Sequence, residues 1–420
     1  MAATGADARD AKGRIRVAVT GLGVKTGAGT NLESFWATLT SGVSTAATIK
    51  RFDPSHLPVR FGCEVVDFDP TEYLSVKEAR RLDRTTHLGF AAAADALAMA
   101  GDHRCDPARS AVIVGTGVGG LGTLEEQVTV YLEKGPARVS PFLVPMMMVN
   151  ATAGMIAMQF GWKGPNLCIA TACAASANAI GEAARLIRDG SADIAMTGGA
   201  EASLTGTALS AFARMTALST RNDDPTHASR PFDADRDGFV MGEGAAALVL
   251  ERWDRAVARG AHIHGEIVGY GRNADAYHIT APSPGGEGAA ACMELALEDA
   301  GLSPVDIAHI NAHGTSTPLN DAAEAEAIRK VFGDAAPPVT STKGVTGHLI
   351  GAAGATEAVA CLLAFAKGEV APTANLERLG DDIALDVVSG TPRAIAPAPA
   401  LSNSFGFGGH NATLVLAPPS

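Results

Sequence analysis

Residues 164–190 read GPNLCIATACAASANAIGEAARLIRDG, and this stretch decides the fold. Leu167–Ala170 form a short apolar run that predicts a strand, and the run stops just before Cys173. Apolar residues then recur at spacings of three and four until Gly190, as in an amphipathic helix. The stretch therefore predicts a strand, a tight turn that holds Cys173, and a helix that begins directly after the turn.

The predicted place of Cys173, near a helix N-terminus, suits a nucleophile. Unpaired N–H groups and the positive end of the helix dipole stabilise an anion there, so we expect the thiol pKa to fall below its usual ~8.5. The neighbouring residues are small, which leaves room for a substrate. Because a lone buried cysteine is more often structural, a catalytic role for Cys173 depends on other motifs.

Length and composition bound the possible classes. A chain of 420 residues with 47% hydrophobic residues allows two domains or one large duplicated one. The 47 glycines and 5% aromatic residues suit tightly packed α/β layers, and a net charge of −12 argues against nucleic-acid binding. The six cysteines form no CxxC motif, so we expect reduced thiols in a cytoplasmic protein.

The first residues lack the apolar core of a signal peptide, and we expect residues 1–13 to be a disordered tail. The pattern also indicates no membrane span, because polar residues interrupt every apolar run before about 18 residues.

Strand and helix patterns alternate twice along the chain, which predicts two similar α/β halves, residues 14–260 and 261–420. Cys173 opens a helix of small residues in the first half, and His348 opens one in the second. We also expect a helix over residues 72–84 and a strand over residues 385–388.

Gly115, Gly117 and Gly120 match the dinucleotide fingerprint G-x-G-x-x-G after a strand, which raises the possibility of an NAD-dependent oxidoreductase. However, no strand with a terminal acid follows about 20 residues later, as ribose binding needs. The pattern favours a tight turn with close backbone packing.

Two other patterns resemble metal sites. Asp233, Asp235 and Asp237 resemble the start of a calcium loop, but the expected bidentate acid falls on Gly244. His262 and His264 are expected on one strand face, and two ligands without a third are weak evidence. We expect no bound metal.

Histidines stand in two glycine-rich turns after predicted strands, NAHGTST with His313 and KGVTGH with His348. A third glycine loop, residues 403–410, precedes the last strand. Because α/β folds place their sites at the carboxyl ends of strands, these turns and Cys173 together imply one site between the halves.

The motifs TACAAS, NAHGTSTPLNDAAE, STKGVTGHLIGAAG and NSFGFGGHN, with SRPFDADRDGFVMGEGA between them, resemble the beta-ketoacyl-ACP synthases of the thiolase superfamily. The resemblance runs from about residue 15 to the end. It implies a thiolase-like fold, in which two duplicated α/β halves form a layered α-β-α-β-α core. It favours the elongating synthases of type II fatty-acid synthesis or their polyketide relatives, and leaves open which of the two.

The resemblance implies decarboxylative Claisen condensation. The acyl group is carried on Cys173, and neutral His313 and His348 donate hydrogen bonds to the enolate of malonyl-ACP. The backbone N–H groups of Cys173 and Phe407 hold the tetrahedral intermediate. Lys343 holds the His348 region, and Glu324 anchors a network of His313 and Lys343.

The resemblance also assigns binding roles. Thr315 and Thr317 bind the phosphopantetheine arm, Phe405 and Phe407 gate the pocket, and Phe212 and Val118 line it. No cofactor is permanently bound, because the pantetheine arm of the acyl carrier protein arrives with the substrate. A degradative thiolase would need a second catalytic cysteine near the C-terminus, whereas the last cysteine here is Cys361.

The expected partners are an acyl carrier protein and a second subunit. The second subunit is either another copy of the chain or a chain-length-factor-like subunit that lacks the cysteine. A basic cluster on one predicted helix is the expected docking patch for the acidic carrier protein: Lys77, Arg80, Arg81 and Arg84.

Overall fold

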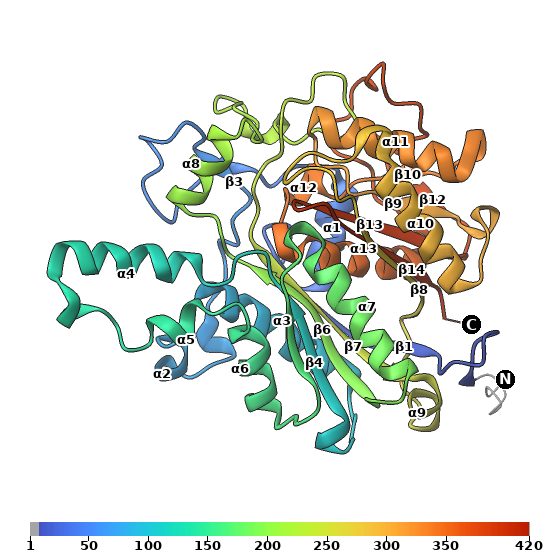
Figure 1. Ribbon diagram of the computed structural model, residues 1–420, viewed down its shortest axis with the longest axis horizontal. Helices are drawn as coiled ribbons and strands as arrows, with labels where there is room; N and C mark the ends of the chain where they lie inside the picture. The colour runs from blue at the N-terminus through green and yellow to red at the C-terminus, as the bar shows by residue number, and fades with distance from the viewer. Residues whose placement is uncertain (1–7, 420) are drawn as a thin grey trace.

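The computed structural model describes residues 8–419, and a ten-stranded mixed sheet is its central feature (Figure 1). In spatial order the strands are β10 (Val339–Thr340), β9 (His309–Asn311), β13 (Ala400–Gly406), β14 (His410–Ala417), β8 (Gly265–Ala274), β1 (Val17–Thr26), β7 (Gly244–Arg252), β6 (Ile194–Glu201), β4 (Ser110–Gly115) and β5 (Asn166–Ile169).

The two sides of this sheet repeat one another. They meet where Ala18 and Val19 of β1 pair with Glu266 and Gly265 of β8. Outward from this junction, each side begins with two antiparallel pairings and continues with two parallel ones. In each half, the strand next to the junction (β1 or β8) is the first strand of that half in the sequence. Its outer neighbour (β7 or β14) is the last strand of the same half. The prediction of two duplicated α/β halves is confirmed.

The helices divide between outer faces and a shared middle layer. Helix α3 (Arg84–Ala100) packs on β1, β7 and β6, and α10 (Glu287–Ala300) packs on β8 and β14. Helices α7 (Ala175–Arg188) and α13 (Ala353–Lys367) contact each other and strands of both halves (Figure 1). The remaining helices of four or more residues are α1 (Leu32–Ser41), α2 (Val76–Ala79), α4 (Leu121–Lys134), α5 (Leu143–Met147), α6 (Ala151–Phe160), α8 (Gly206–Arg214), α9 (Trp253–Ala258), α11 (Pro318–Phe332) and α12 (Lys343–Thr346).

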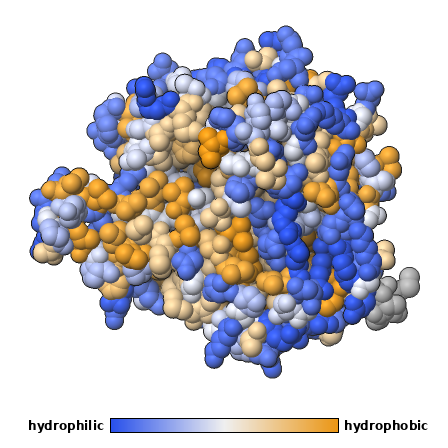
Figure 2. Space-filling view, viewed as in Figure 1, coloured by the Kyte–Doolittle hydropathy of each residue, from blue (hydrophilic) through white to orange (hydrophobic). Residues whose placement is uncertain are grey.

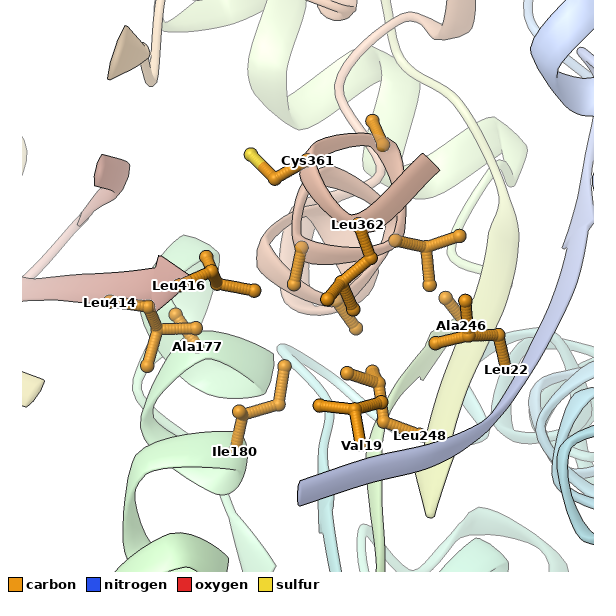
Figure 3. Close-up of a cluster of buried hydrophobic side chains, with 14 of the residues drawn as sticks. Val19, Leu22, Ala177, Ile180, Ala246, Leu248, Cys361, Leu362, Leu414 and Leu416 are labelled. Atoms are coloured by element: carbon orange, nitrogen blue, oxygen red, sulfur yellow. The ribbon is translucent and has the colours of Figure 1, made fainter. Parts of the chain in front are cut away.

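Small residues allow α7 and α13 to lie close together. A Cβ atom added to Gly354 would come within 2.8 Å of the Ala177 Cβ, so a larger side chain would force the helices apart. Apolar side chains from α7, α13, β1, β7 and β14 fill the surrounding core (Figure 3): Val19, Leu22, Ile180, Leu248, Leu362, Leu414 and Leu416. This core fixes the helix starts that carry the site.

Several predicted elements differ from the structure. The helix expected over residues 72–84 is only the four-residue α2, because Ser75 caps one helix start and Asp83 caps the start of α3. Residues 385–388 form no strand and make one isolated bridge, between Val387 and Val339. Most of the expected glycine loop 403–410 belongs to the hairpin of β13 and β14.

The N-terminal segment and one apolar helix also differ from expectation. Residues 8–13, expected to be disordered, fold back on the chain: Gly13 N–H donates to the Asp10 carbonyl, and Lys12 donates to the Glu298 carbonyl. Residues 1–7 of the predicted tail lie outside the described residues. Ile350–Lys367 has the length and hydropathy of a membrane-spanning helix, and 78% of it is buried inside the molecule.

Candidate active site

Cys173 lies in a short 3-10 turn, residues 172–174, between β5 and α7, as predicted. Ala172 adopts a left-handed backbone (φ 48°), which turns the chain sharply into the helix. Cys173 is 7% exposed, and the backbone N–H groups of Phe407 and of Cys173 itself interact with its sulfur. The turn therefore presents a buried thiol to two backbone donors.

The expected lowering of the thiol pKa is wrong for this structure. Burial raises the pKa of Cys173 to about 11 and outweighs the opposite effects of the Phe407 N–H and the Lys343 charge. The helix terminus, which is visible in the sequence, lowers the pKa. The apolar walls around the sulfur, which come from segments distant in sequence, raise it by more.

The two predicted histidines converge on Cys173. His313 follows β9 and His348 follows α12, and their rings stand edge to face with centroids 5.2 Å apart. One nitrogen from each ring and the Cys173 sulfur lie within 4.8 Å of one another. Burial and the nearby Lys343 charge hold the pKa of both histidines well below the usual value. Both imidazoles are therefore neutral at pH 7, and each carries one N–H that can donate a hydrogen bond.

Lys343 was predicted to hold the His348 region. In the structure its hydrogen bond goes to the His313 turn instead. The Lys343 side chain is 1% exposed, and its ammonium group donates a hydrogen bond of 2.6 Å to the His313 carbonyl oxygen. Its ion-pair partner is the buried carboxylate of Glu357, on α13. Lys343 therefore ties the His313 turn to the central helix.

Glu324 anchors the His313 turn through backbone N–H groups and Asn403, whereas Lys343 pairs with a different carboxylate. Its two oxygens accept hydrogen bonds from the backbone N–H groups of His313 (2.8 Å) and Gly314 (2.7 Å). Asn403 also donates to this carboxylate, at 3.2 Å. Burial raises the pKa of Glu324 to about 7. The expected network is therefore divided between two carboxylates, Glu324 and Glu357.

Sequence reasoning missed Glu357, Asn403 and Phe239. Glu357 is the only charged residue of α13 before Lys367, and a lone acid in an apolar helix is a signal for a buried ion pair. Phe239 stands edge to face with His348, with centroids 5.4 Å apart, but lies in a loop that gave no such signal.

The site opens into a cavity of about 860 Å³ that brings the predicted binding residues together. Its lining includes Cys173, His313, His348, Val118, Phe212, Thr315, Thr317, Phe405 and Phe407. The centroids of the Phe212 and Phe407 rings lie 6.3 Å apart. The hydroxyl groups of Thr315 and Thr317 hydrogen-bond each other at 3.0 Å, and Thr317 also caps α11. The exposed wall of the cavity is largely apolar, as is typical of a site for a hydrophobic ligand.

The Gly115–Gly120 turn does not offer a phosphate site. The Gly117 N–H, which a pyrophosphate would need, instead donates to the buried Glu201 carboxylate at 2.6 Å. An anion at this position would meet that carboxylate, so the turn has the packing role favoured from the sequence.

The two metal-like patterns have other partners. Asp233 accepts hydrogen bonds from Arg230 and from the backbone N–H groups of Asp235 and Glu377. His262 and His264 lie before β8 rather than on it, and their rings stack edge to face with centroids 4.5 Å apart.

The predicted basic patch loses one member. Lys77, Arg80 and Arg81 are exposed, whereas the Arg84 guanidinium points inward and pairs with the buried Glu243 at 2.8 Å. Arg84 is therefore a structural residue of the α3 start, and the patch consists of the other three side chains.

Comparison with known proteins identifies the family. The model of the beta-ketoacyl synthase N-terminal domain matches residues 15–256, and that of the C-terminal domain matches residues 264–377. The chain belongs to the beta-ketoacyl synthase family.

Individual relatives agree with this assignment. The chain is 51% identical to 3-oxoacyl-[acyl-carrier-protein] synthase 2 of Synechocystis sp., over 96% of this chain and 97% of that one. Among solved structures, the ishigamide ketosynthase/chain length factor matches with a TM-score of 0.91 and 36% identity, covering 97% of this chain and 100% of that one. A type II polyketide ketosynthase in complex with its acyl-carrier protein and bound to the hexaketide matches with a TM-score of 0.89 and 31% identity, covering 97% and 100%.

Proposed function

We propose that this ketosynthase condenses malonyl-ACP with an acyl group held as a thioester on Cys173, and so elongates the chain by two carbons in fatty-acid synthesis. The observation that carries the proposal is the grouping of the Cys173 sulfur with one nitrogen each of His313 and His348, all within 4.8 Å at one cavity. The 51% identity to a 3-oxoacyl-ACP synthase 2 supports the fatty-acid pathway over the polyketide pathway, since the type II polyketide ketosynthase structure is 31% identical.

The first half-reaction transfers the acyl group. The Cys173 sulfur attacks the thioester carbonyl of acyl-ACP, a new S–C bond forms, and the pantetheine sulfur leaves with the thiol proton. Negative charge collects on the carbonyl oxygen during this step. The N–H groups of Cys173 and Phe407 would hold that charge, and their interaction with the sulfur supports this role.

The second half-reaction uses the histidines. Malonyl-ACP loses CO2, and its electron pair forms an enolate whose oxygen accepts hydrogen bonds from neutral His313 and His348. The enolate carbon then attacks the acyl carbon, and the bond from that carbon to Cys173 breaks. Because neither histidine has to take up a proton before the enolate forms, their low pKa values suit donors better than bases.

The carrier protein is the proposed partner at Lys77, Arg80 and Arg81, which are exposed on an otherwise acidic chain. The pantetheine arm would enter the cavity past Thr315 and Thr317 as part of the substrate, with no permanently bound cofactor. All six cysteines are free, which fits a reducing compartment, and we place the reaction in the cytoplasm.

A second copy of the chain is the proposed subunit partner. Hydrophobic residues cover the projecting arm of α4 and α5 (Figure 2), and Tyr131, Leu132 and Val144 are more than half exposed there. β5 lies at the edge of the sheet with Leu167 exposed, so its backbone groups are available for pairing. Native mass spectrometry should find twice the 42.7 kDa chain mass, whereas a chain-length-factor partner would give a heterodimer on co-expression.

The deciding experiment is intact mass after incubation with acyl carrier proteins of several chain lengths, followed by malonyl-ACP. We expect one acyl group on Cys173 and then its release as a 3-oxoacyl-ACP that is two carbons longer. Acylation elsewhere, or acylation that malonyl-ACP does not discharge, would refute the proposed reaction.

A further inference from the structure

Glu201, the last residue of β6, is a buried carboxylate that the proposed reaction steps do not use. Its side chain is fully buried, and its Oε2 accepts hydrogen bonds from the Gly117 N–H at 2.6 Å and the Gly351 N–H at 3.2 Å. Its Oε1 has no hydrogen-bond partner among residues 8–419. Burying a carboxylate is costly unless hydrogen bonds compensate it, and here the donors are the backbone N–H groups of two different turns.

The two donors belong to two separate walls of the cavity. Gly117 precedes Val118 in the turn after β4, and Gly351 follows Ile350 in the turn before α13. Val118 and Ile350 both line the cavity beside Cys173. The two turns touch directly, since a Cβ added to Gly351 would lie 2.1 Å from the Gly117 nitrogen. The Glu201 carboxylate lies at this junction and bonds to both sides.

The backbone of Ile350 needs such a restraint. Its φ is 46°, in the left-handed region that β-branched residues rarely adopt, at a typical cost of about 1–3 kcal/mol. The bond from the next residue, Gly351, to Glu201 holds this conformation. Without it, Ile350 could relax and change the width of the cavity beside Val118.

We propose that Glu201 is a positioning residue for acyl-chain selection, which fixes Val118 and Ile350 relative to each other by bonding both turns. The inference rests on the proposed role of the cavity as the acyl site. Malonyl decarboxylation takes place at His313 and His348 and makes no use of these walls, so Glu201 should affect chain selection far more than decarboxylation.

The test compares Glu201→Ala, Glu201→Gln and Glu251→Gln. Glu251 is the control for loss of a buried carboxylate, because it is buried on the adjacent strand, opposite Ile194 at the other end of β6, about 23 Å from Glu201. Its own partner is Arg259, at 2.8 Å. Each variant is assayed for the rate of Cys173 acylation across a series of acyl-ACP lengths, for malonyl-ACP decarboxylation, and for thermal unfolding.

We expect Glu201→Ala to change the ratio of long-chain to short-chain acylation rates by about 10- to 100-fold, because a 1 Å misplacement at a site can cost up to about 10²-fold in rate. Its decarboxylation rate should stay within about threefold of wild type. Glu201→Gln retains an acceptor oxygen for both N–H groups and should preserve the chain-length profile, as should Glu251→Gln.

A chain-length profile unchanged in Glu201→Ala would overturn the inference, as would equal changes in Glu201→Ala and Glu201→Gln. If Glu201→Ala does not fold, soluble Glu201→Asp, whose shorter side chain cannot reach both turns, replaces it with the same expectations. Val118→Ala tests the proposed acyl site independently of Glu201, because Val118 itself lines the cavity. If it leaves the profile unchanged, the proposed acyl site is wrong; if it alters the profile and Glu201→Ala does not, only the Glu201 inference fails.

Discussion

The Lys343 ammonium donates a hydrogen bond of 2.6 Å to the carbonyl oxygen of His313, across 30 residues of sequence. The same group pairs with Glu357 on α13, so one buried cation joins the His313 turn to the helix that follows His348. The position of the His313 turn therefore depends on one ion pair in the core.

Removing this cation should be costly. Lys343→Met leaves Glu357 buried without a partner, and we expect the free energy of unfolding to fall by about 3–5 kcal/mol. Urea unfolding of Lys343→Met, Glu357→Gln and the double variant measures the coupling. The double variant should be more stable than Lys343→Met, and a loss equal to the sum of the single losses would contradict the ion pair.

Alkylation of Cys173 should report its raised pKa of about 11. Because the thiolate is the reactive form, the rate with iodoacetamide should rise about tenfold per pH unit from pH 7 to 10. Intact mass locates the label, and Cys173→Ala corrects for the other thiols. An alkylation rate that levels off below pH 9 would show that the backbone donors lower the thiol pKa by more than burial raises it.

The histidines should matter more for decarboxylation than for acyl transfer. His313→Ala or His348→Ala removes one enolate donor, and loss of such a donor typically lowers the rate by about 10²–10³. Decarboxylation of malonyl-ACP and acylation of Cys173 are measured separately in each variant. Equal losses in both steps would contradict this division of roles.

Charge reversal at Arg80 and Arg81 should raise the KM for acyl-ACP steeply, because an acidic carrier protein would then meet negative side chains. A small pantetheine thioester does not contact this patch, so its turnover should barely change. Arg104→Glu is the control, because this residue is also exposed and lies outside the patch. Similar losses with both substrates would mean that the two arginines are structural.

Glu324 should make stability depend on pH. Burial raises its pKa from 4.5 to about 7, so the folded chain holds the proton more tightly than the unfolded chain. The stability from this group is fully present below pH 4.5 and is lost as pH rises through 7, by on the order of 3 kcal/mol. Glu324→Gln should flatten the fall in unfolding free energy over this range, measured by urea titration. If the unfolding free energy of Glu324→Gln falls with pH as steeply as that of the wild type, the raised pKa of Glu324 is not the cause.

The turn that holds Cys173 and the placement of His313 and His348 could be predicted because their signals are local. An apolar run, a glycine-rich turn and a helical period each lie within about 20 residues, and strand ends collect on one edge of a sheet. The repeated rhythm of strands and helices likewise predicted the two halves.

The remaining features depend on long-range contacts. Arg84 resembled its basic neighbours, yet it pairs with Glu243, 159 residues away. Glu357 gave a signal only as a lone acid in an apolar helix, and its partner could not be read from that helix. The high pKa of Cys173 comes from walls that distant segments contribute, and no local pattern reports such burial.

The turns at Ala172 and Ile350 occupy corresponding places in the two halves. Each begins a three-residue 3-10 turn with a left-handed residue, and each turn leads directly into a central helix. Gly351 thus stands in the second half where Cys173 stands in the first. Both halves therefore contain the same turn backbone, and only the turn of the first half carries a cysteine. A cysteine at 351 could not restore the symmetry, since its Cβ would meet the Gly117 nitrogen.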